Sequence, residues 1–152
     1  MAIEAYVADL FARVGPVADL YAVDVYENEN LWHVAVDERA VVFAEWSAER
    51  RIVVLSADLG APREESRARF HELALRYNDA WTESGGLRLA LDGAGAATLL
   101  LDWVPARGAE RELGSLLHRF AIAAAAWREA LQRPPTAMPS GLSDSDFQMI
   151  RI

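Results

Sequence analysis

The most constraining feature of this chain is the order in which the spacing of its apolar residues changes. Helical spacing and the two-residue spacing of strands alternate along the sequence until a long helical stretch closes the pattern. Read in order, the pattern predicts a helix, three strands, a second helix, two strands and a third helix. Such a chain is expected to fold as an α+β protein in which helices pack on an antiparallel sheet.

The first helix and the three strands after it follow from spacing alone. An apolar face runs along residues 3–14, and Gly15-Pro16 is expected to end the helix. Strands are predicted at 31–36, 40–46 and 52–59, where apolar and β-branched residues alternate or run together. The connections between these strands are too short for a parallel crossover, so the strands are expected to form an antiparallel meander. The helical face consists of Ile3, Val7, Leu10, Phe11 and Val14.

The second half of the pattern predicts a helix, a hairpin and a last helix. Pro62 suits a first helical turn, and Gly85-Gly86 can adopt the positive φ of the loop that follows the helix. Strands are predicted at 87–91 and 98–104, joined by the turn Asp92–Gly95. The helix before this hairpin presents Phe70, Leu73, Ala74, Tyr77 and Trp81. The last helix presents Leu113, Leu116, Leu117, Phe120, Ala124, Trp127 and Leu131.

Length and charge limit the classes of protein that this chain can represent. Its 152 residues suit one domain, predicted over 1–131, with a flexible tail over 132–152 that is rich in proline and serine. A net charge of −8 would repel phosphate backbones, so nucleic acid is not expected as a partner. Apolar runs are too short to span a membrane, and the start of the chain lacks the features of a secretory signal. The expected location is the cytoplasm.

The sequence lacks the usual catalytic and metal-binding patterns. The chain has no cysteine, and His33, His71 and His118 lack the paired spacing of a zinc site. The glycine-rich stretch at 92–98 leads into a predicted strand, whereas a phosphate-binding loop opens a helix. No enzyme activity, metal or cofactor is therefore expected. The five tryptophans fit either a core or a protein interface, and the whole pattern is typical of an interaction domain.

The stretch from Leu73 to Pro105, LALRYNDAWTESGGLRLALDGAGAATLLLDWVP, resembles the class I chaperones of type III secretion, the family of the Tir chaperone. In that family the second helix ends in asparagine with small and aromatic residues, a glycine pair opens the next strand, and the hairpin ends at proline. The positions that match are Asn78, Ala80, Trp81, Gly85, Gly86 and Pro105. The resemblance extends over about residues 3–131.

This resemblance implies a homodimer in the bacterial cytoplasm that binds the N-terminal region of one or more secreted effectors. Such a chaperone keeps that region extended and soluble and delivers it to the secretion ATPase. It does not hydrolyse ATP itself, and its role is in virulence. By analogy, an effector groove between the first helix and the sheet would use Leu10, Phe11, Val14, Leu31, Val34, Phe43 and Trp46. The dimer interface would use Phe70, His71, Ala74, Tyr77, Leu87 and Leu89.

Two other readings stay open at this point. A regulatory adaptor of similar fold could sequester a cytoplasmic protein without exporting it, and a small enzyme of unknown reaction is a third class. The groove residues could equally belong to the core, because amphipathic faces look alike in a sequence.

Overall fold

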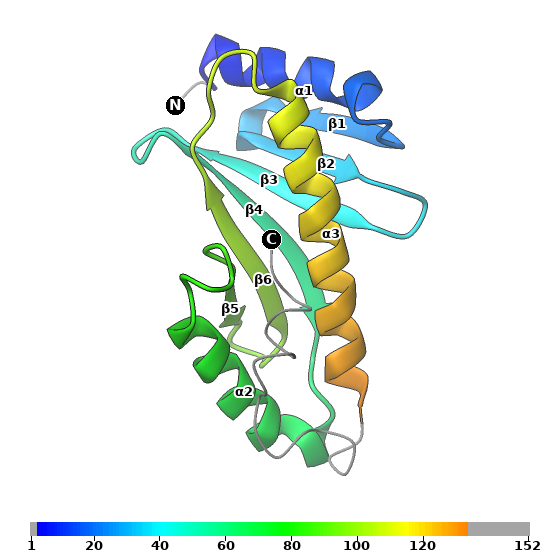
Figure 1. The fold of residues 1–152 in the computed structure, drawn as a ribbon, viewed down its shortest axis with the longest axis vertical. Helices are drawn as coiled ribbons and strands as arrows, with labels where there is room; N and C mark the ends of the chain where they lie inside the picture. Colours follow the sequence, from blue (N-terminus) through cyan, green and yellow to red (C-terminus); the bar gives the residue numbers. More distant parts are fainter. Residues whose placement is uncertain (1–2, 134–152) are drawn as a thin grey trace. The chain divides into compact units, whose positions relative to one another are not determined.

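A computed structural model describes residues 3–133 of the chain (Figure 1). Six strands form an open antiparallel sheet in the order β1-β2-β3-β4-β6-β5. The α+β class predicted from the sequence is confirmed. The helices are α1 (Ala5–Val17), α2 (Arg67–Asp79) and α3 (Glu110–Gln132), with short 3₁₀ turns at Glu27–Glu29 and Glu64–Ser66. The strands are β1 (Ala22–Tyr26), β2 (Leu31–Ala35), β3 (Val41–Ser47), β4 (Ile52–Gly60), β5 (Arg88–Leu91) and β6 (Ala97–Trp103).

The described residues divide into two compact units that interleave along the sequence. Unit 1 comprises residues 3–57 and 102–121, and unit 2 comprises 58–101 and 122–133. Both units draw on β4, β6 and α3, because the unit boundaries fall within these elements. The single domain expected over 1–131 stays a prediction. The tail expected over 132–152 lies outside the described residues, apart from its first two positions.

Helix α2 begins at Arg67, so Pro62 lies before the helix and not in its first turn as expected. Two further elements differ from the sequence-based prediction. Strand β1 was not predicted, and it places a sixth strand at the edge of the sheet beside β2. The other correction concerns α1, which runs through Pro16 and ends at Val17 instead of stopping at Gly15-Pro16. Proline cannot donate to the carbonyl four residues earlier and usually breaks a helix interior. Pro16 lies in the last turn, where the amide of Ala18 still donates to the Val14 carbonyl at 2.9 Å.

The core of unit 1 lies between α1, the first half of α3 and one face of the meander. Phe11 of α1 stacks on Trp32 of β2, with ring centroids 4.1 Å apart and planes inclined by 12°. Val34, Val42 and Ala44 are fully buried on that same sheet face. Alternate residues of the strands therefore point toward the helices, and the residues between them point to the opposite face.

The core of unit 2 is built around Trp127 near the end of α3. The rings of Phe70 and Tyr77, both on α2, meet the indole edge-on at 6.0 and 4.9 Å. The stripe predicted for the last helix is confirmed, because every one of its residues is buried. Trp81 was wrongly placed on the α2 stripe: the helix ends at Asp79, and the indole is 63% exposed in the following turn. Among the described residues, no helix combines the length and apolarity needed to cross a membrane.

Candidate functional site

An apolar groove lies between α1 and the edge strand β1 in unit 1, where the two elements run beside each other (Figure 1). Its volume is about 250 Å³. The rings of Phe11 and Trp32 and the side chains of Val23 and Val25 line its apolar part. Because the two stacked rings are buried, this part of the groove is preformed and rigid. Such a surface can accept an aliphatic side chain without first rearranging.

The rim of the groove combines two exposed alanines with two carboxylates. Ala8 and Ala12 lie one helical turn apart on α1, where their small side chains leave the groove open to solvent. Asp9 of α1 and Glu27, at the end of β1, complete the lining. The groove is therefore apolar inside and negatively charged at its margins.

Strand β1 leaves one whole side without a strand partner among the described residues, because it stands at the end of the sheet order. On its other side it pairs with β2, with Val23 opposite Val34 and Val25 opposite Trp32. Backbone N–H and C=O groups along such an edge can pair with an added strand. The groove and the open edge are adjacent, since Val23 and Val25 belong to both.

The opposite edge of the sheet, β5 in unit 2, is partly closed by a side chain. The amide of Asn78 donates from Nδ2 to the carbonyl oxygen of Leu89 at 3.0 Å, and its Oδ1 accepts from the Leu89 N–H at 2.8 Å. One amide group thus satisfies the donor and the acceptor that an added strand would otherwise use at this residue. Asn78 is one of the residues that carried the family resemblance, and the structure gives it this physical role.

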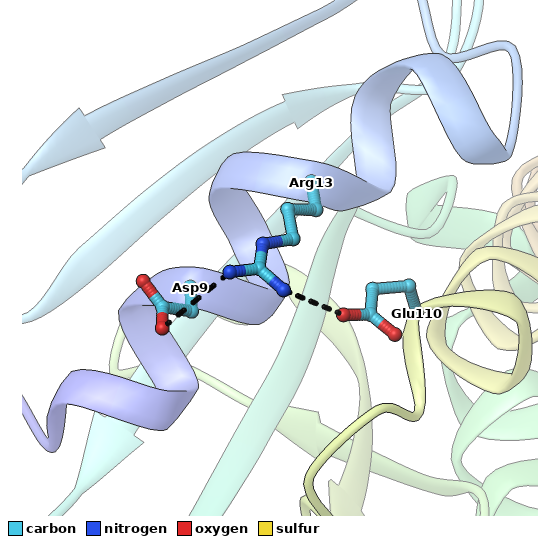
Figure 2. Close-up of polar contacts among 3 residues, drawn as sticks. All are labelled: Asp9, Arg13 and Glu110. Atoms are coloured by element: carbon cyan, nitrogen blue, oxygen red, sulfur yellow. Dashed lines mark ion pairs between the residues drawn. The ribbon is translucent and has the colours of Figure 1, made fainter.

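Arg13 connects α1 to the start of α3 through two weak ion pairs (Figure 2). Its guanidinium lies 3.9 Å from a carboxylate oxygen of Asp9 and 3.9 Å from one of Glu110. Arg107 lies over the ring of Tyr6, 5.2 Å from its centroid, in the same region. Arg13 therefore has two alternative acidic partners, of which Asp9 also belongs to the groove.

The structure separates the seven predicted effector-binding residues into three groups. Phe11 alone among them lines the groove. Leu10, Val14, Val34 and Trp46 are buried inside unit 1. On the opposite sheet face, away from α1, are Leu31 and Phe43.

The groove residues that the sequence analysis did not name come mainly from β1, which was itself not predicted. Val23 and Val25 alternate with Asp24 and Tyr26, and that period of two was the available signal. Ala8 and Ala12 gave none, because a small exposed residue marks a groove only when its neighbours are known.

The predicted dimer-interface residues fall in unit 2, around a second hollow of about 320 Å³ between α2 and β5. His71, Ala74 and Leu89 line it. Also lining it are Leu75, which is 71% exposed, and Leu91, which is 44% exposed. The other three predicted residues, Phe70, Tyr77 and Leu87, are buried within the protomer.

Tyr77 has a strongly perturbed hydroxyl in the core of unit 2. Burial raises the pKa of Tyr77 to about 12, and the neighbouring polar groups of Trp127 and Ser84 offset part of this effect. The phenol lies within the hydrophobic core and does not reach either groove. We therefore interpret the shift as a consequence of packing.

The histidines contact different residues. His33 Nδ1 is 4.0 Å from an Asp24 oxygen, and His118 Nε2 is 2.8 Å from the carbonyl oxygen of Ala18. Within residues 3–133 no group of three or more histidine, cysteine, aspartate or glutamate residues is arranged to hold a metal ion.

Three solved structures share the fold of this chain. A chain of the ExsC–ExsE complex matches with a TM-score of 0.68 and 20% identity, over 86% of this chain and 97% of that one. A chain of the HopA1–SchA chaperone–effector complex matches with a TM-score of 0.66 and 13% identity, over 82% and 94% of the two chains.

The third structure is that of the Yersinia pestis type III secretion chaperone SycH in complex with a stable fragment of YscM2. It matches with a TM-score of 0.54 and 21% identity, over 76% of this chain and 97% of that one. No protein-family model matches the chain, and no curated protein matches its sequence. The resemblance inferred from residues 73–105 is confirmed at the level of the fold: the chain has the fold of type III secretion chaperones.

Proposed function

We propose that this protein is a type III secretion chaperone of the bacterial cytoplasm. It binds the N-terminal region of one or more effectors, keeps that region extended and soluble, and delivers it to the export apparatus and its ATPase. The fold is shared with a chain of a chaperone–effector complex and with the type III secretion chaperone SycH, and this supports the general role.

The observation that carries the proposal is the groove between α1 and β1. A rigid apolar hollow adjoins an open strand edge, so one surface offers both side-chain pockets and backbone hydrogen bonds. A client segment without fixed structure can use both at once by adding a strand to the sheet. Bound in this way, the segment stays extended and its apolar side chains are shielded from water.

The proposed role is that of a binding protein and requires no reaction. Both hollows described above are lined mainly by apolar side chains, and among the described residues the strongly shifted pKa belongs to a core tyrosine. Binding clients, without chemistry on them, accounts for these features.

We further propose that the protein acts as a homodimer that uses the hollow between α2 and β5. Leu75 and Leu91 supply exposed apolar surface beside His71 and Leu89. A stable dimer typically buries at least ~1,200 Å² in total, so the interface must extend beyond this hollow. Trp81, exposed in the turn after α2, supplies further apolar surface in the same unit.

Co-purification of the chain with the N-terminal ~100 residues of candidate exported proteins tests the proposal. This test compares two variants of exposed alanines with the unchanged chain. Ala12→Arg should fill the groove and abolish complex formation, whereas Ala125→Arg, on an exposed position of α3, should leave it intact. Arginine is a good helix former, so neither change should unfold its helix.

Several outcomes would count against the proposal. A complex that survives Ala12→Arg with unchanged affinity would exclude the groove as the client site. Partners that are never exported would point instead to the regulatory adaptor.

A further inference from the structure

We propose that the groove between α1 and β1 selects clients in which apolar and basic residues alternate along an extended segment. The apolar residues face Val23 and Val25, and the arginine or lysine residues between them face Asp24. This inference rests on the proposed function and adds to it the chemistry of the client.

The choice of β1 as the docking edge follows from comparing the two ends of the sheet. At β5 the Asn78 amide already occupies both backbone groups of Leu89. The outer side of β1 pairs with no strand in the described part of the chain. An added strand therefore finds more unpaired backbone groups at β1.

The two faces of β1 differ in chemistry, and an added strand would continue both. Val23 and Val25 point to the α1 side, because they lie opposite Val34 and Trp32 of β2. Asp24 and Tyr26 point to the other side. Side chains on neighbouring strands meet on the same face, with Cβ atoms about 4.5–5.5 Å apart when directly opposite. Every second client residue would thus enter the groove, and the residues between would lie beside Asp24 and Tyr26.

The charge around β1 specifies what those intervening residues should be. Between Arg13 and Arg39 the sequence has no arginine or lysine and six carboxylates: Asp19, Asp24, Glu27, Glu29, Asp37 and Glu38. The Asp24 side chain is 66% exposed, and its nearest basic neighbour is the His33 ring at 4.0 Å. A client arginine could pair with this carboxylate and also lie against the ring of Tyr26, which favours cations over its face.

Asp9 can join this recognition because its present partner has an alternative. Arg13 lies 3.9 Å from a carboxylate oxygen of Asp9 and 3.9 Å from one of Glu110. Figure 2 draws both ion pairs. If a client cation pairs with Asp9, Arg13 can still pair with Glu110. Asp9 lies on the groove side, so its partner would be a basic residue that flanks the extended stretch, and not one of the alternating residues that face Asp24.

Four synthetic peptides test the inference against the chain of 152 residues. The first is an acetylated and amidated Gly-Arg-Val-Arg-Leu-Arg-Val-Gly, in which apolar and basic residues alternate. In the second and third, glutamine or glutamate replaces each arginine. The fourth, Gly-Arg-Arg-Arg-Val-Leu-Val-Gly, has the composition of the first without its alternation. Titration calorimetry at low and at physiological salt measures each affinity.

The alternating basic peptide should bind best, at least about tenfold more tightly than the glutamate and the sorted peptides at low salt. Its affinity should fall as salt rises, because the contacts involve exposed charges. The variant Asp24→Asn should bind this peptide about threefold more weakly, in the range expected for one surface ion pair, and should bind the glutamine peptide unchanged. The control Asp79→Asn makes the same change in net charge, from −8 to −7, on an exposed residue of unit 2. It should leave both affinities unchanged.

Other results would overturn the inference in distinguishable ways. Equal affinity for the arginine, glutamine and glutamate peptides would show a groove that binds without selecting charge, which contradicts the inference and leaves the proposed function standing. Equal affinity for the sorted peptide would contradict the alternation. Absence of binding by all four peptides would also overturn the inference, while the proposed function would still be decided by co-purification and the Ala12→Arg variant.

Discussion

Gly114 illustrates how a single residue sets the approach of two helices in unit 1. A Cβ atom at this position would lie 2.4 Å from the Cβ of Ala18, at the end of α1, and 3.7 Å from a methyl group of Val14. Only glycine therefore allows α3 to pass this close, and the contact brings His118 within hydrogen-bonding distance of the Ala18 carbonyl. The position of α1, on which the groove depends, is fixed partly at this crossing.

Gly114→Ala should destabilise the protein by about 1–2 kcal/mol. Overpacking typically costs about 1–3 kcal/mol, and the better helix propensity of alanine recovers up to ~1 kcal/mol of it. Urea denaturation followed by tryptophan fluorescence measures the change. Ser115→Ala, at the adjacent exposed position, is the control, and Ala18→Gly in the Gly114→Ala background should restore stability. If Gly114→Ala were more stable than the unchanged chain, the claim that only glycine fits against Ala18 would be wrong.

The raised pKa of Tyr77 predicts that the protein loses stability at alkaline pH. Because burial raises the pKa of Tyr77 in the folded protein to about 12, above its ordinary value of 10.0, the folded state retains the phenolic proton more strongly than the unfolded state does. Its stabilising contribution is fully present below pH 10 and is lost as the pH rises to about 12. The loss amounts to about 2–3 kcal/mol for this shift.

The free energy of unfolding, measured from pH 9 to pH 12, tests this expectation. The chain has no lysine, so no ammonium group obscures this range. Tyr77→Phe should show a correspondingly flatter profile, whereas Tyr21→Phe, at an exposed position, should not change it. If the free energy of unfolding falls with pH equally steeply in the unchanged chain and in Tyr77→Phe, Tyr77 is not the cause of the fall.

At the scale of elements, Asn78 acts as a side-chain substitute for a strand. Asn78→Ala would leave the backbone groups of Leu89 without their partner, and the loss of two hydrogen bonds should cost about 1–3 kcal/mol. Faster exchange of the Leu89 amide hydrogen and a lower urea midpoint are expected. Asn28→Ala, at an exposed position in the turn after β1, is the control and should change neither. An unchanged exchange rate at Leu89 would show that Asn78 does not protect this edge.

How well the sequence predicted each element follows from how much of that element is buried. The α3 stripe and strands β2, β3, β4 and β6 were predicted within about two residues, because their buried residues recur at regular spacing. Strand β1 was missed since three of its five residues are exposed, and an edge strand needs only one apolar face. Trp81 was misassigned because it continues the apolar spacing of α2 past the point where the helix ends.

The candidate groove was harder to predict than the fold because residues from separate elements come together to form it. Phe11 and Trp46 both look like groove or core residues in the sequence, and the structure places one in the groove and the other in the core. Spacing identifies the face of an element. It does not show which part of that face another element covers. At β1, the face is open beside Ala8 and Ala12 of α1.

For the whole molecule, the proposed dimer makes a direct prediction about mass. Light scattering coupled to size exclusion should give about twice the 16.8 kDa of one chain. Leu75→Arg places a charge on the exposed apolar surface beside the α2–β5 hollow and should shift the mass to that of a monomer. Ala68→Arg, also exposed on α2 but outside the hollow, should stay dimeric. If the Leu75→Arg protein keeps the mass of a dimer, the dimer interface lies elsewhere.

The central claim is that the groove between α1 and β1 holds an extended client segment, and amide hydrogen exchange tests it most directly. The chain would be measured alone and with a co-purified client segment. Client binding should slow exchange along β1 (Ala22–Tyr26), where new backbone hydrogen bonds form, and should change it little at the β5 edge next to Asn78. Unchanged exchange along β1 in a fully formed complex would show that the client does not bind at this edge.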